Sequence, residues 1–436
     1  MKKYISIIII FCLLLTSIPV IVGDQSNQTI LYVDDDNREG PWDGSSTYPF
    51  QCINDAVQSA EQNTLIFIRN GYYPEQIIVD KSISFRGENK EETIVDGENL
   101  HGVFVIEGTD YIMIENLTIT KGSQTESDLS AGIILIQTSH NIISNCIMKE
   151  NDVGILISQN SSNCICYNND ISNNALGIDL CSSQKNLLYG NTISENGINL
   201  GLYNSENNLI TKNNIINSEK NVEFFTSKDI LQENYWGRET SFYLIFGFQY
   251  LTSIGITVPW FKCDFSPVSS KNGFNINPLV RMDTTMGSMT IELFSTEMPI
   301  TSSNFIQLAE IDFFDNLVFH RVIDDFVIQG GGFYANGTEK ESPLGTIELE
   351  IHPDINHVDG AISMARTNDP NSATSQFFIC DGAQDRLDGQ YAAFGKTIVG
   401  LDVLQAIASV ETTTKYFFMK DWPVDDVIIQ GIETIS

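Results

Sequence analysis

The middle of the chain is built from four consecutive repeats of 22, 23, 22 and 21 residues. Each repeat opens with Asn followed by apolar residues, and then alternates short apolar runs with Asn, Ser, Gly and Asp. The opening residues are Asn141, Asn163, Asn186 and Asn208. A second Asn follows five positions later, at Asn168, Asn191 and Asn213. A unit this short cannot bury its own apolar residues, so neighbouring repeats must stack into one continuous core.

The short apolar runs within each repeat alternate as β-strands do. Strands of stacked repeats pair through their backbones, and their Ile, Leu and Val side chains fill the interior. Asn tolerates the left-handed turns between strands, and stacked Asn side chains hydrogen-bond from one coil to the next. Leucine-rich repeats have a similar period, but the helix-forming half that they need is missing. The repeat therefore predicts a right-handed parallel β-helix, and the chain as a whole is expected to be mainly β.

The same pattern extends upstream with looser spacing. Residues 83–85 alternate as a strand, and residues 53–61 have the spacing of a helix that covers the open end of a solenoid. Residues 32–37 and the sequence NYWG from Asn234 resemble the first and closing coils of secreted β-helix proteins of the pectate-lyase-like kind, the closing coil being common in archaeal members. We expect a parallel β-helix repeat domain over residues 24–237.

Residues 238–278 break the Asn pattern. The stretch 242–260 is aromatic and aliphatic, and it suits either a cap on the last coil or a segment that seeks a surface. An open solenoid end must be covered, which favours the cap. Residues 266–277 contain the Pro, Ser, Lys and Gly typical of a linker into a second domain. We therefore assign residues 238–278 to a cap and linker.

The first 23 residues have the composition of an export segment. Lys2 and Lys3 precede an uncharged run from Ile5 to Val22, and Gly23 leads into polar sequence. This arrangement is typical of a cleaved signal peptide, but a run of about 18 residues is also long enough to stay as a membrane anchor. Under either interpretation we expect the rest of the chain to be secreted or held at the cell surface.

Three blocks in the last part of the chain combine Gln and aromatic residues with Arg, with Gly or with both. They are FHRVIDDFVIQGGGF from Phe319, the segment from SMAR at Ser363 to SQFFI at Ser375, and LDGQYAAFGK from Leu387. In this order and spacing they resemble the cyclophilin-type peptidyl-prolyl cis–trans isomerases over residues 279–436. The resemblance implies an eight-stranded β-barrel capped by two helices, and residues 301–310 and 401–409 have the required helical spacing.

The resemblance also implies roles for individual residues. Arg321 is expected to donate a hydrogen bond toward the prolyl nitrogen, and Gln329 is expected to orient Arg321. Phe326 and Phe378 complete the expected catalytic set. The further residues expected to line the proline site or to bind the peptide backbone are Val327, Ala365, Arg366, Gln376, Leu387 and Tyr391.

The implied reaction is rotation about an X–Pro bond. Its barrier is roughly 18–20 kcal/mol because the C–N bond has partial double-bond character. A hydrogen bond to the prolyl nitrogen weakens that resonance, and an apolar surface holds the ring while the preceding carbonyl turns. We therefore expect no metal and no cofactor, and we expect proline-containing polypeptides as substrates.

Four positions depart from the commonest family pattern. Val327 stands where Met is common, Arg366 where Asn is common, and Tyr391 where many members have His. Arg386 occupies the position of a Trp that is associated with tight cyclosporin binding. We expect activity to survive these changes, whereas the sequence does not settle the sensitivity to cyclosporin.

Composition narrows the range of partners. The chain carries 24 basic and 56 acidic residues, a net charge of −32, so the clustered Lys and Arg that nucleic-acid binding requires are missing. Beyond Cys12 in the export segment, seven cysteines at irregular spacing do not form the pattern of a disulfide framework. The acidic run 34–36 is interpreted as a solvated turn rather than a cation site.

We interpret the chain as a secreted or surface-tethered prokaryotic protein of archaeal type, in which an isomerase acts on X–Pro bonds of extracytoplasmic proteins. The β-helix is expected to act as a spacer or to bind a surface polysaccharide, and a membrane partner is expected only if the N-terminal segment is retained. Two alternatives stay open. One is an adhesion module that binds proline peptides without catalysis, and the other is a carbohydrate-active enzyme centred on the solenoid.

Overall fold

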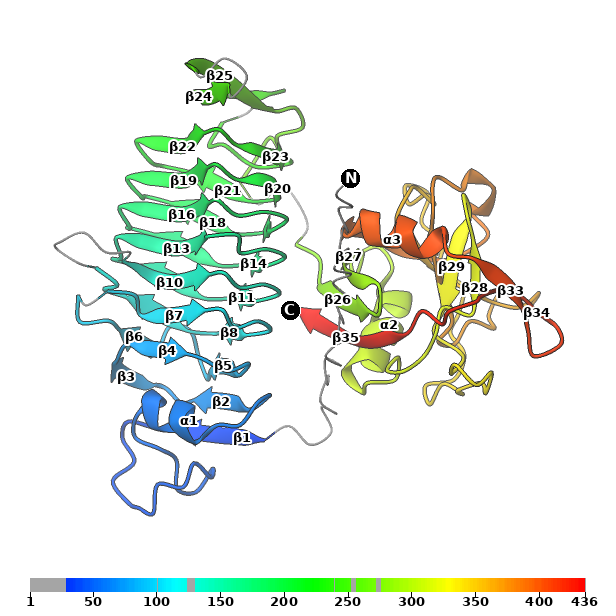
Figure 1. Ribbon diagram of the computed structural model, residues 1–436, viewed down its shortest axis with the longest axis horizontal. Coiled ribbons are helices and arrows are strands. Elements are labelled where there is room, and N and C mark those ends of the chain that lie inside the picture. The colour runs from blue at the N-terminus through cyan, green and yellow to red at the C-terminus, as the bar shows by residue number, and fades with distance from the viewer. Residues whose placement is uncertain are drawn as a thin grey trace, which may run out of the picture.

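The computed structural model describes residues 29–99, 101–123, 130–238, 240–251, 256–271 and 276–435. The expected export segment, residues 1–23, lies outside the described residues. Figure 1 shows a tall stack of coils beside an antiparallel sheet that is accompanied by helices. Within the described ranges, no helix is both long enough and apolar enough to cross a membrane.

Three sheets run along the stack, and each full coil contributes one strand to each of them. The first sheet consists of β1 (Ile30–Val33), β2 (Leu65–Ile68), β5 (Ser84–Gly87), β8 (Met113–Glu115), β11 (Ile142–Ser144), β14 (Ile165–Tyr167), β17 (Leu187–Tyr189), β20 (Glu206–Thr211) and β23 (Lys228–Gln232). The second consists of β4 (Ile77–Val79), β7 (Phe104–Glu107), β10 (Ala131–Ile136), β13 (Val153–Ser158), β16 (Leu176–Cys181), β19 (Ile198–Tyr203), β22 (Lys220–Phe225), β24 (Tyr243–Leu251) and β25 (Ile256–Asp264). The third consists of β3 (Gly71–Pro74), β6 (Thr93–Asp96), β9 (Thr118–Thr120), β12 (Ile147–Lys149), β15 (Asp170–Ser172), β18 (Thr192–Ser194) and β21 (Asn214–Ile216).

The interior of the stack is a continuous apolar column. In the second sheet the parallel register places five buried aliphatic side chains directly above one another, namely Ile133, Ile155, Ile178, Leu200 and Val222. Because each coil covers the apolar face of the one before it, no repeat needs a core of its own. The predicted parallel β-helix is confirmed.

Ladders of Asn side chains run from coil to coil at the turns, as predicted. In one ladder Asn169, Asn191 and Asn213 are buried, and each backbone N–H donates to the Oδ1 of the next coil's Asn or equivalent residue. Cys164 and Asn169 hold ladder positions, since their backbone N–H groups donate to Asn186 Oδ1 and Asn191 Oδ1. Asn163 and Asn168, one residue earlier, form left-handed turns with φ of 54° and 52°, as expected for Asn.

Both ends of the solenoid are covered. Helix α1 (Ile53–Ser59) buries Ile53, Ala56 and Val57 at the first coil, confirming the predicted capping helix. At the other end, the hairpin β24–β25 buries Ile245 in the solenoid core, and Asp264 accepts the terminal hydrogen bond of the Asn ladder from Asn234. The inner part of the hairpin therefore lies over the last coil.

The C-terminal part forms an eight-stranded antiparallel sheet with two helices, as predicted. In spatial order its strands are β28 (Arg321–Ile323), β29 (Val327–Gly330), β31 (Phe377–Cys380), β30 (Ala361–Met364), β32 (Ala393–Val399), β27 (Gly287–Leu293), β26 (Leu279–Thr284) and β35 (Ile429–Ile435). An antiparallel bridge between Val318 and Ile428 joins the chain ahead of the two outermost strands. The other elements are α2 (Pro299–Glu310), the 3₁₀ turn η2 (Asp385–Leu387), α3 (Leu401–Ala408), β33 (Thr412–Lys415) and β34 (Met419–Pro423).

The two parts of the chain are packed against each other. Outward-facing apolar residues of the first solenoid sheet form a buried cluster with two residues of the C-terminal sheet; its buried members are Ile142, Ile165, Tyr167, Leu187, Tyr189, Leu279 and Ile435. Polar contacts surround this cluster. Arg281 Nη1 donates to the carbonyl of His140 at 2.8 Å, and Lys185 Nζ lies 2.8 Å from Asp402 Oδ2. The C-terminal sheet is therefore seated on one face of the solenoid.

Candidate active site

Three of the predicted catalytic side chains lie on three neighbouring strands. Arg321 on β28 is directly opposite Gln329 on β29, and Gln329 is directly opposite Phe378 on β31. Directly opposed residues of an antiparallel sheet project from the same face. The register alone thus brings Arg321, Gln329 and Phe378 side by side, although 57 positions separate the first from the last.

Gln329 and Gln376 are joined by a hydrogen bond. Nε2 of Gln329 donates to Oε1 of Gln376 over 3.2 Å. Gln376 lies against Gly332, where a Cβ would approach its side chain to 2.6 Å. The glycine run after β29 is therefore required for close packing against Gln376 as well as for the left-handed turn at Gly331, where φ is 82°.

An apolar cluster next to Arg321 and Gln329 contains the apolar and aromatic residues predicted for the site, while the polar ones, Arg366 and Gln376 included, lie outside it. Its buried members are Val327, Ala361, Phe378 and Cys380, and its half-buried members are Phe326, Ala365, Leu387 and Tyr391. This cluster, here called the Phe378 cluster, is separate from the main core of the sheet. The buried members form the apolar centre of the cluster, and the half-buried members reach the surface. A binding surface for a proline ring requires both.

Arg321 is held at the edge of the Phe378 cluster. Its side chain is 38% exposed, and its Nε lies 3.9 Å from Oδ2 of Asp421 on β34. The guanidinium carbon lies 5.8 Å from the centre of the Phe326 ring. The guanidinium therefore remains accessible from solvent beside the apolar cluster. Asp421 could not be predicted as a neighbour of Arg321, because it follows Arg321 by 100 positions on a separate hairpin.

Two further Arg residues stack on aromatic rings of the cluster. The guanidinium of Arg386 lies over the Phe326 ring at 4.2 Å, and that of Arg366 lies over the Tyr391 ring at 4.7 Å. Arg366 also donates to the carbonyl of Gln390 through Nη2 at 2.9 Å. Arg366 is thus bound to the neighbouring loop, and its contact with a peptide backbone stays a prediction.

A buried polar network supports the Phe378 ring from behind. The imidazole of His357 is stacked on Phe378 at a centroid distance of 5.9 Å. Its Nδ1 lies 2.8 Å from Asp388 Oδ1 and its Nε2 lies 3.0 Å from Ser363 Oγ. Burial acts to raise the pKa of Asp388, but hydrogen bonds from the His357 backbone and ring outweigh it and lower that pKa. Sequence reasoning missed this network, since its three residues lie on three separate segments.

His320, beside Arg321 in the sequence, points into the interior. It is buried edge-on against Phe333, at a centroid distance of 4.7 Å. Burial and the neighbouring Arg321 charge lower its pKa to about 4. The imidazole is therefore neutral at physiological pH, in agreement with its interpretation as a packing residue.

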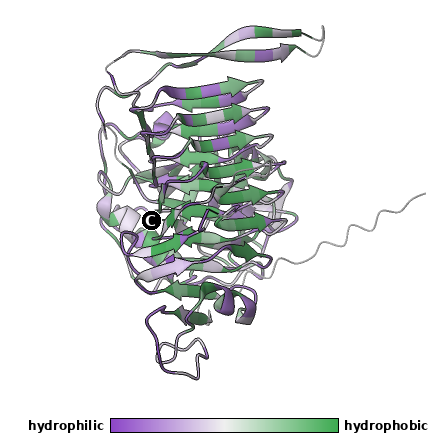
Figure 2. Ribbon diagram, turned by 90° about the vertical axis from the view of Figure 1, so that its left-hand side faces the viewer, coloured by the Kyte–Doolittle hydropathy of each residue, from purple (hydrophilic) through white to green (hydrophobic). Residues whose placement is uncertain are grey.

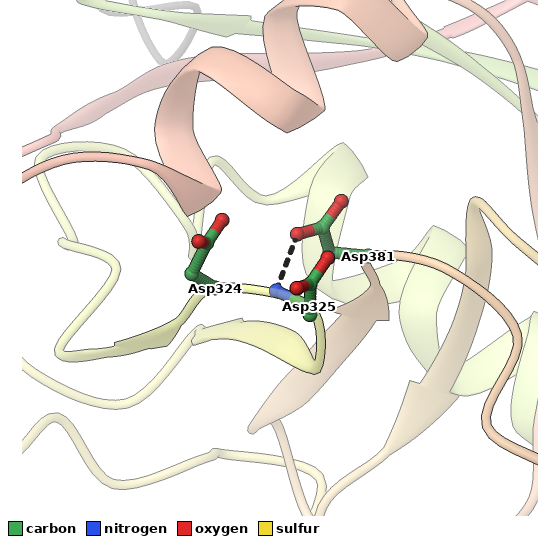
Figure 3. Close-up of side chains that lie close together, drawn as sticks. All are labelled: Asp324, Asp325 and Asp381. Atoms are coloured by element: carbon green, nitrogen blue, oxygen red, sulfur yellow. Dashed lines mark hydrogen bonds between the residues drawn. The ribbon is translucent and has the colours of Figure 1, made fainter.

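Three carboxylates lie next to the Phe378 cluster. Asp324 and Asp325 form the turn between β28 and β29, and Asp381 follows β31; Figure 3 shows them side by side. Oδ2 of Asp381 accepts a hydrogen bond from the Asp325 backbone N–H at 2.9 Å, and burial raises the pKa of Asp381. This contact fixes the turn that immediately precedes Phe326.

Residues 47–255 match the family model described as "Periplasmic copper-binding protein (NosD)". Protein copper sites are typically built from His, Cys and Met ligands. Among the described residues, the carboxylates of Asp324, Asp325 and Asp381 are the only group of three or more His, Cys, Asp or Glu side chains close enough to share an ion, and they lie outside the solenoid. The solenoid cysteines 146, 164 and 166 are buried, and burial raises the pKa of their thiols. The described solenoid residues therefore offer no cluster of three or more His, Cys or carboxylate ligands for a copper ion.

Residues 279–434 match the family model "Cyclophilin type peptidyl-prolyl cis-trans isomerase/CLD". A peptidyl-prolyl cis-trans isomerase of Acinetobacter baylyi is 42% identical over 165 residues, which cover 37% of this chain and 87% of that protein. Arabidopsis thaliana CYP18-2 is 36% identical over 161 residues, covering 36% of this chain and 94% of that protein. These relatives are matched over nearly their full length by the part of the chain that carries Arg321, Gln329 and the Phe378 cluster. The chain thus belongs to the cyclophilin-type peptidyl-prolyl cis–trans isomerases, with the isomerase unit in its C-terminal part.

Proposed function

We propose that this protein accelerates cis–trans isomerisation of X–Pro bonds in proteins outside the cytoplasm, at the surface formed by Arg321, Gln329 and the Phe378 cluster. The observation that carries the proposal is the strand register, which aligns Arg321, Gln329 and Phe378 on one face beside a partly exposed apolar cluster. A cationic donor next to a dry surface is the combination that twisting of a prolyl amide requires.

In the proposed mechanism the proline ring rests on Phe326 and Phe378. Arg321 donates a hydrogen bond toward the prolyl nitrogen as that nitrogen loses conjugation with the preceding carbonyl, and this lowers the barrier to rotation. Gln329 positions the site together with Gln376, to which it is hydrogen-bonded. Ala365, Arg366, Leu387 and Tyr391 complete the substrate contacts, and Val327 forms the floor under the ring.

The extracytoplasmic location is inferred from two observations. The N-terminal 23 residues have the composition of an export segment, and the solenoid matches a family described as periplasmic. The client proteins are accordingly exported polypeptides that contain proline. Cleavage or retention of the export segment, and an archaeal origin, are parts of the same proposal. Residues 24–237, 238–278 and 279–436 are its functional units.

The solenoid is proposed to be a rigid spacer or a binding module for a surface polysaccharide. A cation-dependent carbohydrate-active enzyme centred on the solenoid is disfavoured, because no group of three His, Cys, Asp or Glu ligands occurs on the described coils. The acidic run at the first coil is engaged in structural contacts: Asp34 Oδ2 accepts from Arg69 at 2.9 Å, and Asp35 accepts from the Tyr72 backbone N–H at 3.1 Å.

The test is refolding of a protein whose slow phase is limited by a non-native X–Pro isomer. The full chain at substoichiometric concentration is expected to accelerate that phase, and the Phe378→Ala variant is expected to lose most of the effect. Arg38→Ala, an exposed change near the first strand of the solenoid, serves as the control and should behave as wild type. Binding of proline peptides without any acceleration would support the adhesion module instead.

A further inference from the structure

The hairpin β24–β25 exposes far more apolar surface than capping the solenoid requires. Its register places Leu244, Phe246, Phe248, Tyr250 and Phe261 on the face opposite to buried Ile245. Phe246 is 73% exposed and Phe261 is 58% exposed. Figure 2 shows the hairpin extending past the coil beneath it, with its outer end hydrophobic. Large exposed apolar patches of this kind mark interaction sites.

The other face of the hairpin is apolar and exposed as well, away from its contact with the core. Gly247 lies so close to Phe224 that a Cβ would meet its carbonyl at 2.6 Å, so this point is packed on the last coil. Trp260, which is paired with Gly247 on the outer strand, is nevertheless 50% exposed, and Ile256 is 50% exposed nearer the tip. A partner must therefore surround the edge of the hairpin rather than cover a single face.

Charge is distributed unevenly along the chain, and the hairpin end carries none of the large negative net charge. From Thr240 to Phe261 there are 22 consecutive residues without a charge. Residues 211–271, which span the last coils and the hairpin, carry six acidic and six basic side chains, so the whole net charge of −32 lies elsewhere. The hairpin end is the part of this acidic molecule that approaches an uncharged or anionic surface with least repulsion.

The free edge of the hairpin is protected against strand addition. β25 is the last strand of its sheet, and it contains Pro259, which has no backbone N–H to donate. A second copy that extended the sheet would meet this block. The side chains on both faces are accessible, whereas the backbone edge is interrupted at Pro259 and cannot extend a continuous ladder, which points to a partner that contacts side chains.

We propose that the hairpin β24–β25 seats the protein on a lipid bilayer, with its aromatic side chains in the interfacial region. Trp, Tyr and Phe are favoured at that depth because their rings are apolar while the environment still supplies water and headgroups. The unpaired edge of β25 excludes deeper insertion, since the hydrocarbon core offers no partner for its backbone groups. The isomerase unit is then held at the membrane surface by the solenoid.

The direct test uses the full chain and the fluorescence of Trp260. Trp236 and Trp422 are buried, so the Trp42→Phe variant leaves Trp260 as the exposed indole. Phosphatidylcholine vesicles are expected to shift the Trp260 emission to shorter wavelength, and a nitroxide near the headgroups should quench it more than one at the chain end. Unchanged emission would overturn the proposal. So would a shift that requires high protein concentration rather than lipid, which would identify a second copy as the partner.

Two comparisons separate the hairpin from other causes of vesicle binding. The triple variant Phe246→Ser, Phe248→Ser, Phe261→Ser is expected to weaken vesicle binding at least about tenfold, because burial of each ring contributes. Phe417→Ser with Phe418→Ser removes two rings that are 104% and 77% exposed in the isomerase unit, and should leave binding unchanged. In the Trp260→Phe variant, Trp42 is the exposed indole and reports on the first coil. If lipid nitroxides quench Trp42 in this variant but do not quench Trp260 in the Trp42→Phe variant, the protein attaches by the opposite end, and the proposal is overturned.

Discussion

Lys212 of the solenoid lies with its Nζ 2.5 Å from Oε1 of Glu292 in the isomerase sheet, and this ion pair is buried between the two units. The same carboxylate oxygen accepts from Tyr189 Oη at 3.0 Å and from Asn277 Nδ2 at 2.8 Å. A carboxylate buried this deeply is tolerated only because it has three donors. The contact joins the solenoid and the isomerase, so the isomerase should depend on the solenoid for part of its stability.

Removing one partner of this pair is expected to be costly. Lys212→Met leaves Glu292 buried without its cation, and we expect the free energy of unfolding to fall by about 3 kcal/mol. Denaturant unfolding of the full chain, followed by a signal from the isomerase unit, measures the loss. The matched control is Lys228→Met, whose pair with Glu206 is largely exposed and should contribute less than about 1 kcal/mol. Equal effects of the two variants would contradict the account.

Asp421 is expected to act on catalysis through Arg321. Asp421→Asn removes the negative charge 3.9 Å from the Arg321 Nε, and the guanidinium should then sample more orientations. We expect kcat/KM for a prolyl peptide to fall by about threefold to tenfold, which corresponds to about 1 kcal/mol. Asp421→Glu should restore most of the activity. Asp425→Asn, an exposed change on the same segment, is the control and should have no effect.

The Asn ladder is expected to contribute to the stability of the solenoid. Asn191 is fully buried, and its side chain accepts from the Asn169 backbone and donates to the carbonyl of Cys166 and to Asn213 Oδ1. Asn191→Ala leaves these groups buried without their hydrogen-bond partners, and we expect a loss of about 3 kcal/mol or more in the free energy of unfolding. Calorimetric melting of the full chain measures it.

The comparison for the ladder is an Asn outside it. Asn204 lies at an exposed left-handed turn with φ of 52°, where Gly is equally suitable. Asn204→Gly should therefore change the melting temperature little. A melting temperature lowered by Asn204→Gly as much as by Asn191→Ala would remove the special role assigned to the ladder.

Acid should destabilise the protein through His320. Its folded pKa of about 4 lies below the usual value of 6.5, so the unfolded chain binds more protons between these two values. The stability contributed by neutral His320 is complete above pH 6.5 and is lost as pH falls toward 4. Between pH 7 and pH 5 this loss amounts to about 2 kcal/mol. Unfolding of His320→Phe at the two pH values should show a smaller difference than wild type by about that amount, and an unchanged difference would contradict the burial argument.

Much of the fold follows from local pattern. Alternating apolar residues and the 22-residue period predict stacked parallel strands, and helices near residues 53, 301 and 401 follow from their spacing. The pattern does not distinguish Asn168, at a left-handed turn, from Asn169, in the ladder, because Asn suits both positions. Neighbouring residues of one type therefore carry no information about which of them points inward.

The contact between the solenoid and the isomerase unit could not be predicted from the sequence pattern. Ile142 and Ile143, or Leu187 and Leu188, are consecutive apolar residues on strands that need only one inward face. The extra apolar residue is a signal that the outer face is also covered, but it does not say by what. Asp421 and the His357 network were missed for a related reason. The fold brings together segments whose separation in the sequence follows no pattern.

Catalysis by the aligned Arg321, Gln329 and Phe378 is measured most directly as cis–trans exchange of a short Ala-Pro peptide by NMR. The full chain is expected to accelerate exchange at catalytic concentration, and Arg321→Ala should reduce the acceleration by about a hundredfold, or about 2.7 kcal/mol, while the peptide still binds. Exchange that is equally fast in wild type and in a correctly folded Arg321→Ala variant would contradict the assignment of Arg321 as the catalytic donor.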